Sequence, residues 1–325
     1  MNATAGWNLK FRGGMLCALA VSLVAFQAVG HSQNANLDGL DDTLQTYARG
    51  QSVVPIFGGW IKNPDGTYDL VFSYLNRNWQ EEVDIPIGPD NNFQPAQYGP
   101  DAGQPTHFLP RNNRWVFTVK APANFGPTGE VIWTLTSHGQ TLRAYASLKN
   151  GYVLDDYTLQ HEYSAGAADA SHERKPPDLQ VPGAKQRTVK VGEAAQLIAT
   201  AVDKNAPLGG GRRRGAAPVY PAEVGPGPVG GQATRDEPPG LRFAWFVYRG
   251  DAKQVVFSPK MAFKVWEDLR GGSPWAPGWQ PPPLPADNTW RYTVTFKAPG
   301  TYMLRGQAHN GTHFSNEDVT FTVTP

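Results

Sequence analysis

Cysteine is almost absent from this chain of 325 residues, which contains only Cys17. Cys17 lies in an apolar run that extends from Met15 to Val29. If this run is removed on export, the remaining chain has no cysteine, and no disulfide can form even in an oxidising compartment. Packing of apolar side chains must then stabilise the fold.

The first 30 residues also lack acidic side chains, while Lys10 and Arg12 precede the apolar run. The run is shorter than the roughly 20 residues that a helix needs to cross a bilayer, and the small-residue triplet Ala28-Val29-Gly30 ends it. These features predict a secretory signal peptide over residues 1–30, cleaved after Gly30, and therefore an exported protein, periplasmic or extracellular. No later segment approaches membrane-spanning length, so we expect no integral membrane segment after cleavage.

Charged residues are scarce, at 18% of the chain, and 29 basic residues face 28 acidic ones. Removal of Lys10 and Arg12 leaves 27 basic residues against 28 acidic ones, a formal charge of −1. No nucleic-acid partner is expected, because such binding needs clustered cations. The motifs of metalloproteases, serine hydrolases, phosphate loops and dinucleotide sites are also missing, so no catalytic residue is predicted.

Glycine and proline are abundant, with 35 and 29 residues, and together they favour many turns between short strands. The length exceeds the roughly 100–150 residues of a typical domain, and short apolar segments recur at the spacing of a β-sandwich. We predict an all-β chain with two immunoglobulin-like β-sandwich domains in tandem after the signal peptide. The predicted parts are a flexible polar arm (31–52), a first sandwich (53–149), a connector (150–186) and a second sandwich (187–325) with long inserts at 205–240 and 271–287.

Local patterns support the strands of both sandwiches. Pro64-Asp65-Gly66 separates two apolar segments and predicts a hairpin. Residues 114–120 alternate so that Trp115, Phe117 and Val119 are expected to face the core. The segment 88–110 contains too many Gly, Pro and Asn residues for strands and is predicted to be an ordered loop. FTVKAP at 117–122 and VTFKAP at 294–299 form a short internal repeat, which indicates that the two modules share a sandwich architecture.

The second half resembles the PKD-type, immunoglobulin-like modules of bacterial secreted proteins. The segments VKVGEAAQLIATAVD (189–203), LRFAWFV (241–247) and FKAPGTYMLRGQAHNG (296–311) carry the resemblance. Tyr302, two residues before Leu304, has the spacing of a tyrosine corner. The resemblance implies a non-catalytic spacer, adhesion or binding module. The first half resembles the immunoglobulin-like class only broadly, in the rhythm of its strands.

Aromatic residues in the two long loops are the candidate ligand-binding residues, because exposed aromatic surface in a secreted module favours a partner. They are Trp266, Trp275 and Trp279 around the proline-rich insert, with Phe93 and Tyr98 in the segment 88–110. The alternative is that these rings close the ends of the sandwiches. A protein or polysaccharide surface is the expected partner.

No cofactor is expected, although two metals are open alternatives. His31 would become the new N-terminus after cleavage and could form a copper histidine brace with a second histidine. His309 and His313 flank a turn and could form a metal pair. Calcium could bind at Asp155-Asp156, Glu162 and 203–205, although their spacing matches no calcium loop.

The leading functional hypothesis is a non-catalytic, secreted or periplasmic interaction protein that presents aromatic loops on two β-sandwiches. One alternative is a carbohydrate-binding module. Another is a secreted enzyme, such as a copper oxidase of the histidine-brace kind, so the question of catalysis stays open.

Overall fold

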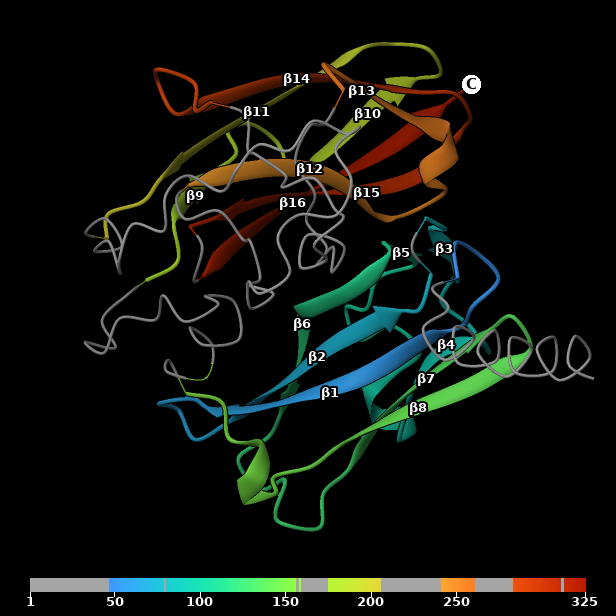
Figure 1. Cartoon of the computed structure of the whole chain (residues 1–325), viewed down its shortest axis with the longest axis vertical. Helices are drawn as coiled ribbons and strands as arrows, with labels where there is room; N and C mark the ends of the chain where they lie inside the picture. The colour runs from blue at the N-terminus through green and yellow to red at the C-terminus, as the bar shows by residue number, and fades with distance from the viewer. Residues whose placement is uncertain are drawn as a thin grey trace, which may run out of the picture. The chain divides into compact units, whose positions relative to one another are not determined.

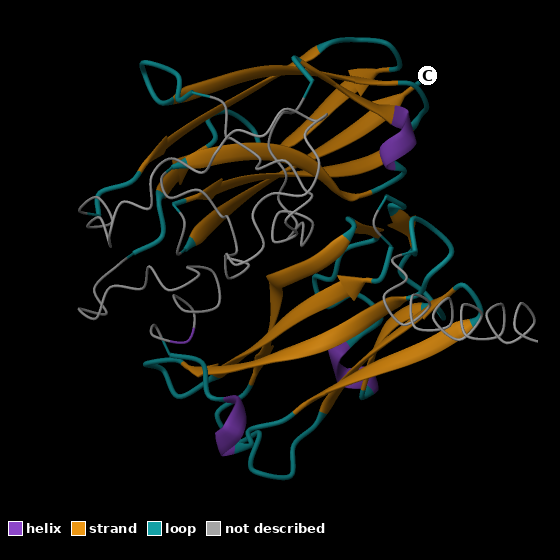
Figure 2. Ribbon diagram, viewed as in Figure 1, coloured by secondary structure: helices purple, strands orange, loops and turns teal. Residues whose placement is uncertain are grey.

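The computed structural model describes residues 47–78, 80–155, 158, 175–205, 241–260, 283–310 and 313–325 (Figure 1). Ala48–Pro325 form one compact unit, and each sandwich within it has its own hydrophobic core. Figure 2 shows that strands dominate the described residues, with only short helical turns between them. No helix in these ranges is long and apolar enough to cross a membrane. The all-β prediction is confirmed.

The first sandwich contains eight strands in the described residues. They are β1 (Val53–Lys62), β2 (Tyr68–Asn76), β3 (Val83–Asp84), β4 (Asn91–Gln94), β5 (His107–Phe108), β6 (Arg111–Ala121), β7 (Val131–Ser137) and β8 (Gln140–Ala146). One sheet has the order β1-β2-β6, a second has the order β4-β7-β8, and β3 and β5 form a separate two-stranded ribbon. β1 and β2 form the predicted hairpin, in which Asp65 accepts a hydrogen bond from the Thr67 backbone at 2.9 Å.

Aromatic rings fill the space between these two sheets. The fully buried Trp133 lies perpendicular to Phe117, with 5.0 Å between ring centroids, and stacks on Phe93 at 6.0 Å. Phe72 contacts all three rings. This cluster is the centre of the first core.

The expected alternation along β6 is confirmed at one end and wrong at the other. Phe117 and Val119 are buried and Thr118 is exposed, but Trp115 is only half-buried. The pairing of β2 with β6 shifts register at this point, and Trp115 adopts a left-handed φ of 53°. Its ring lies so close to Gly58 that no Cβ atom would fit there. The irregularity therefore turns the ring away from the position that simple alternation predicts.

The segment 88–110 was predicted to contain no strands, and this is wrong. β4 and β5 both lie in it, and β4 pairs with β7 in register from Asn91↔Leu135 to Gln94↔Ile132. Tertiary contacts override the low strand preference of asparagine, because the Asn91 side chain is buried and hydrogen-bonded.

The second sandwich also contains eight strands in the described residues. They are β9 (Asp178–Gln180), β10 (Gln186–Lys190), β11 (Ala195–Val202), β12 (Arg242–Arg249), β13 (Val255–Ser258), β14 (Thr289–Phe296), β15 (Gly300–His309) and β16 (Phe314–Thr324). Its sheets have the orders β13-β14-β11-β9 and β10-β16-β15-β12, with β10 parallel to β16. Leu197, Trp245, Phe296, Leu304 and Phe321 are fully buried between them.

Both strand orders are those of immunoglobulin-like sandwiches. In the second sandwich, β9, β11, β14 and β13 take the places of strands A, B, E and D, and β12, β15 and β16 those of C, F and G. In the first sandwich, β1, β2 and β6 take the places of strands A, B and E. β4, β7 and β8 take the places of strands C, F and G. The repeat noted in the sequence ends β6 and β14, which are the E strands of the two sandwiches. The tandem immunoglobulin-like prediction is therefore confirmed by topology.

The predicted tyrosine corner is confirmed. The hydroxyl of Tyr302, in β15, donates a hydrogen bond to the carbonyl of Ala298 at 3.0 Å. Leu304 lies fully buried two residues further on. This contact fixes the connection between the E and F strands.

The range predicted as a connector is partly built into both sandwiches. Val153 forms a parallel bridge with Trp60, directly after the short 3₁₀ turn η3 (Asn150–Tyr152). β9 also lies in this range and pairs with β11, while Val181 is buried in the second core. The described ends of this segment therefore pack against the sandwich that they adjoin.

Candidate functional site

The ribbon of β3 and β5 is hydrogen-bonded to the second sandwich. Within the ribbon, the amide of Ile85 donates to the carbonyl of Thr106 at 2.8 Å. The amide of Thr106 in turn donates to the carbonyl of Tyr248, at the end of β12, at 3.1 Å. The amide of Gly250 donates to Thr106 Oγ1 at 3.0 Å. Thr106 thus connects the two sandwiches through backbone and side chain.

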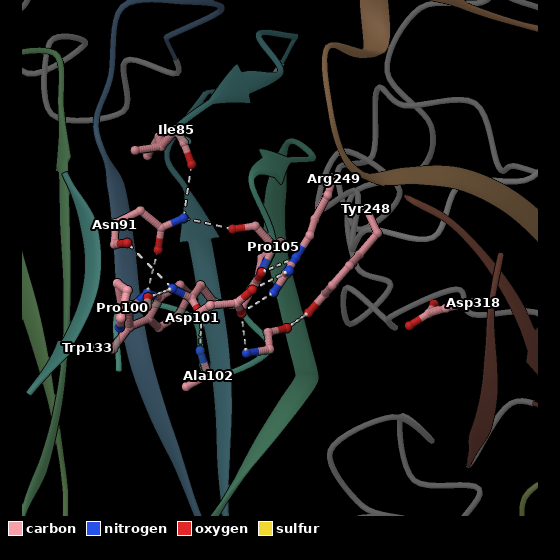
Figure 3. Close-up of polar contacts among 12 residues, drawn as sticks. Ile85, Asn91, Pro100, Asp101, Ala102, Pro105, Trp133, Tyr248, Arg249 and Asp318 are labelled. Carbon is pink, nitrogen blue, oxygen red and sulfur yellow. Dashed lines mark hydrogen bonds and ion pairs between the residues drawn. The ribbon is translucent and has the colours of Figure 1, made fainter. Parts of the chain in front are cut away.

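Asn91, whose side chain is fully buried, anchors the loop that leads into β5 (Figure 3). Asn91 Nδ2 donates to the carbonyls of Ile85 and Pro105, each at 2.9 Å. Its Oδ1 accepts from Trp133 Nε1 at 3.0 Å. One side chain therefore ties both strands of the ribbon, at one of its ends, to the first core, and its polar atoms are paired as buried polar groups require.

Arg249, at the end of β12, forms hydrogen bonds with the same loop (Figure 3). Its two terminal nitrogens contact the two carboxylate oxygens of Asp101 at 2.9 and 2.8 Å, and its Nε donates to the carbonyl of Gln104 at 2.9 Å. The neighbouring Tyr248 donates its hydroxyl to the carbonyl of Gly103 at 2.7 Å. The hydrogen bond from Arg249 lowers the pKa of Asp101, so this carboxylate stays ionised in neutral solution. Two-point contact of this kind fixes geometry as well as distance.

Arg305, on β15, forms a second connection and is only 8% exposed. Its guanidinium pairs with both oxygens of Asp318 at 2.8 Å and lies 3.6 Å from the centroid of the Tyr248 ring. It also donates to the carbonyl of Val116, on β6 of the first sandwich, at 2.6 Å. A planar guanidinium can stack and make several hydrogen bonds at once, which an ammonium group cannot do. We call the contacts of Thr106, Tyr248, Arg249 and Arg305 the clasp.

His107, on β5, directly follows Thr106 of the clasp, and its side chain is only 2% exposed. Its Nδ1 is 2.7 Å from Asp84 Oδ1, and its Nε2 is 3.2 Å from Glu82 Oε2. Burial alone would lower the pKa of His107, but hydrogen bonds to Asp84 and Glu82 outweigh it and raise the pKa to about 9. The imidazolium therefore uses both N–H donors in ion pairs.

This arrangement predicts a pH dependence of stability. The pKa of His107 is raised from 6.5 to about 9 on folding, so its contribution is complete below pH 6.5 and is lost as the pH rises through about 9. We expect the free energy of unfolding to fall by about 2 kcal/mol over this interval, allowing for the solvent exposure of the carboxylates. Urea unfolding followed by fluorescence at several pH values measures it.

His107→Gln is the matched variant, because glutamine cannot carry the charge. Its unfolding free energy should be nearly constant over the same interval. An equally steep decline in this variant would show that another group is responsible.

A cleft of about 450 Å³ opens beside the clasp. It is lined by Asp84, Pro86, Ile87, Thr106, Gly250, Asp251 and Lys253, which come from the ribbon and from the segment that follows β12. A volume of this size is in the range of small-ligand sites. The arrangement offers a binding surface; in the described part of the chain there is no group of three or more His, Cys, Asp or Glu residues arranged to hold a metal ion.

The predicted ligand-binding residues lie elsewhere. Phe93 is 4% exposed and belongs to the first core, so the expectation that its ring forms a binding surface is wrong. Its position on β4 points it inward, between Phe72 and Trp133. Tyr98 is half-buried and packs against the same core. Trp266, Trp275 and Trp279 lie outside the described residues.

Of the histidines predicted as metal ligands, the structure describes His309 and His313. His309 and His313 are both buried, at 4% and 8% exposed, and the His309 ring stacks on Phe314 at 6.1 Å. Burial, together with the nearby charges of Arg242 and His313, keeps the pKa of His309 well below its usual value. His31, Asp156 and Glu162 lie outside the described residues, as do most of the two inserts.

Sequence reasoning missed Arg249, Arg305 and Asp101, and it considered Asp318 only as a carboxylate near the possible metal pair of His309 and His313. The partners in the two connections to the first sandwich are 148 residues apart for Arg249 and Asp101 and 189 for Arg305 and Val116. No local pattern signals pairings of this separation. The buried position of His107 was equally unmarked.

No family model matches the chain, and no curated protein matches it. Among solved structures, it is similar to the S-layer protein rSbsC(31-844), with 11% identity over 79% of this chain and 23% of that one, and a TM-score of 0.20. It is also similar to the adhesin InvE of Yersinia pseudotuberculosis, with 12% identity, 85% and 60% coverage, and a TM-score of 0.22. The chain is also similar to the D00-D0 domain of Intimin, with 10% identity over 83% of this chain and 100% of that one, and a TM-score of 0.22. The chain thus spans less than two thirds of the length of rSbsC and of InvE.

Proposed function

We propose that this chain is an exported, non-catalytic interaction protein that presents its two sandwiches to a protein or polysaccharide partner as one rigid body. The clasp is the observation that carries the proposal. Adjoining domains in one chain usually move relative to each other unless their interface is extensive. Here the backbone of Thr106 and the side chains of Arg249 and Arg305 connect them at separate points.

The contacts of the clasp are of kinds that resist opening. Tyr248 is 2% exposed, and its ring lies against the buried guanidinium of Arg305. Opening would expose the Tyr248 ring and would remove a hydrogen-bond donor from the carbonyls of Val116 and Gly103. Unpaired polar groups and separated ion pairs are costly when they remain partly buried. A rigid pair of sandwiches loses less conformational entropy when a partner binds.

Several finer assignments belong to this proposal. The segments 189–203, 241–247 and 296–311 support a PKD-type second module, and the topology of that sandwich is compatible with it. Export rests on the predicted signal peptide over residues 1–30. The domain boundaries near 53, 150 and 187 rest on the sequence together with the strand positions. The carbohydrate-module and copper-oxidase alternatives depend on residues outside the described ranges and stay predictions.

Rigidity can be tested by distance measurements between spin labels. The chain without residues 1–30 contains no cysteine, so Thr118→Cys and Thr322→Cys place one label on each sandwich at exposed positions. We expect a narrow distance distribution that broadens in Arg249→Ala. Arg291→Ala is the matched control, because Arg291 forms an exposed ion pair with Asp287 away from the clasp, and its distribution should stay narrow.

The interaction itself is tested with the same variants. A partner that is recovered from the envelope of the native host, or identified on a glycan array, should bind Arg249→Ala more weakly than Arg291→Ala. A broad distance distribution in the otherwise unchanged protein would refute rigid presentation. Equal partner binding by both variants would show that recognition does not depend on the clasp.

A further inference from the structure

We propose that the cleft beside the clasp binds a basic side chain of a partner peptide, with arginine as the preferred residue. This inference rests on the proposed interaction function and assigns a chemistry to its partner. It is carried by the juxtaposition of Asp84 and Asp251, which come from different sandwiches and line one cleft together with the apolar residues Pro86 and Ile87.

The shape of the cleft suits a long side chain with an apolar stem. Its volume of about 450 Å³ exceeds that of a single side chain, which leaves room for the flanking peptide backbone. Pro86 and Ile87 lie just beyond β3, after Ile85, and offer an apolar wall. The aliphatic part of an arginine or lysine packs on such surfaces while its charged head reaches polar groups.

The charges in and directly behind the cleft favour a cation. Glu82, Asp84 and Asp251 contribute three negative charges, and His107 and Lys253 contribute two positive ones, which leaves a net charge of −1. Both N–H groups of His107 already contact Glu82 and Asp84, so this cation has no donor left for a ligand. The charge of His107 also acts through space on Asp251, so it is counted in the net charge of −1.

The carboxylates retain acceptor capacity toward the cleft. Asp84 contacts His107 through Oδ1, which leaves Oδ2 outside that bond. Asp251 is exposed and accepts hydrogen bonds from the amide of Lys253 at 3.0 Å and from Gln254 Nε2 at 3.1 Å. These bonds hold the carboxylate in place at the start of the 3₁₀ turn η4 (Ala252–Gln254). Each carboxylate can accept several hydrogen bonds, and a guanidinium supplies five donors in a plane.

The clasp holds the two walls at a fixed separation before any ligand arrives. Thr106 lines the cleft and also bonds to Tyr248 and Gly250. A preformed site avoids the cost of bringing Asp84 and Asp251 together when the ligand binds.

The test is an NMR titration of the chain without residues 1–30, observed at the amides of Thr106, Gly250 and Lys253. The probes are acetyl-Gly-Arg-Gly-amide, the same peptide with neutral citrulline in place of arginine, and the same peptide with glutamate. We expect the arginine peptide to shift these amides and to bind roughly 3- to 10-fold more tightly than the citrulline peptide, with weaker binding at high salt.

Asp251→Asn should reduce binding of the arginine peptide to the level of the citrulline peptide. Asp287→Asn is the control, because Asp287 is an exposed acid that lines no part of the cleft and pairs with Arg291. Asp84→Asn is avoided, because it would also disturb His107.

The outcomes separate this inference from the proposed function. If the citrulline or glutamate peptide binds as well as the arginine peptide, the preference for a cation is wrong while the cleft remains a binding site. If none of the three probes shifts the amides, the inference is overturned. Neither result changes the spin-label distances, which test rigid presentation by themselves.

Discussion

Asn91→Ala is expected to lower the free energy of unfolding by about 3–5 kcal/mol, the largest effect of any substitution considered for this chain. The variant would leave the carbonyls of Ile85 and Pro105 and the indole N–H of Trp133 without their partner. All of these groups are buried with Asn91, and each costs free energy when it is left unpaired. Urea denaturation followed by tryptophan fluorescence measures the loss.

Asn92→Ala is the matched control, one position away on the same strand. The Asn92 side chain donates to the carbonyls of Gly88 and Pro89 near the surface, where water can replace it. We expect a loss below about 1 kcal/mol. Similar losses in the two variants would show that the buried hydrogen bonds of Asn91 contribute no more to the free energy of unfolding than the hydrogen bonds of Asn92 near the surface.

Arg305→Ala is expected to lower the free energy of unfolding by about 3 kcal/mol. The substitution removes the partner of Asp318, the donor to Val116 and the cation on the Tyr248 ring. The value is below that for a wholly enclosed pair, because the Asp318 side chain is 34% exposed and water screens part of the loss. The same denaturation experiment applies.

Arg291→Ala again serves as the control. Arg291 pairs with Asp287 at 2.7 Å, but both side chains are more than half exposed. Such pairs contribute little, so we expect a change within about 0.5 kcal/mol. The loss of unfolding free energy in Arg305→Lys should lie between the losses in Arg305→Ala and Arg291→Ala. Lysine keeps the charge but cannot contact both oxygens of Asp318 in the same plane. A lysine variant as stable as the original would contradict the assigned geometry.

Much of the fold could be predicted because its signals are local. The hairpin of β1 and β2 follows from Pro64-Asp65-Gly66, and the tyrosine corner follows from the spacing of Tyr302 and Leu304. The alternation of apolar residues located most strands of both sandwiches. The exception at Trp115 arises because a shift in pairing register leaves no trace in the hydrophobic pattern.

The candidate site could not be predicted in the same way. β4 contains two adjacent asparagines, which local preference assigns to loops, and its strand forms because buried partners satisfy Asn91. The prediction for Phe93 failed for the same reason, since a loop aromatic was expected at the surface and a strand aromatic lies in the core. Arg249 and Arg305 resemble any other arginine in a strand. Their roles depend on contacts with residues more than a hundred positions away.

The hydrogen bond from Thr106 to Tyr248 affects which strand edge would be exposed if a protease separated the two sandwiches. β12 is the last strand of its sheet, and the ribbon of the first sandwich occupies the backbone groups at its end. A fragment that contains the second sandwich alone would present that strand end to other molecules, and uncovered strand edges are templates for intermolecular pairing. Keeping the two halves on one chain therefore keeps this end of β12 paired with the ribbon.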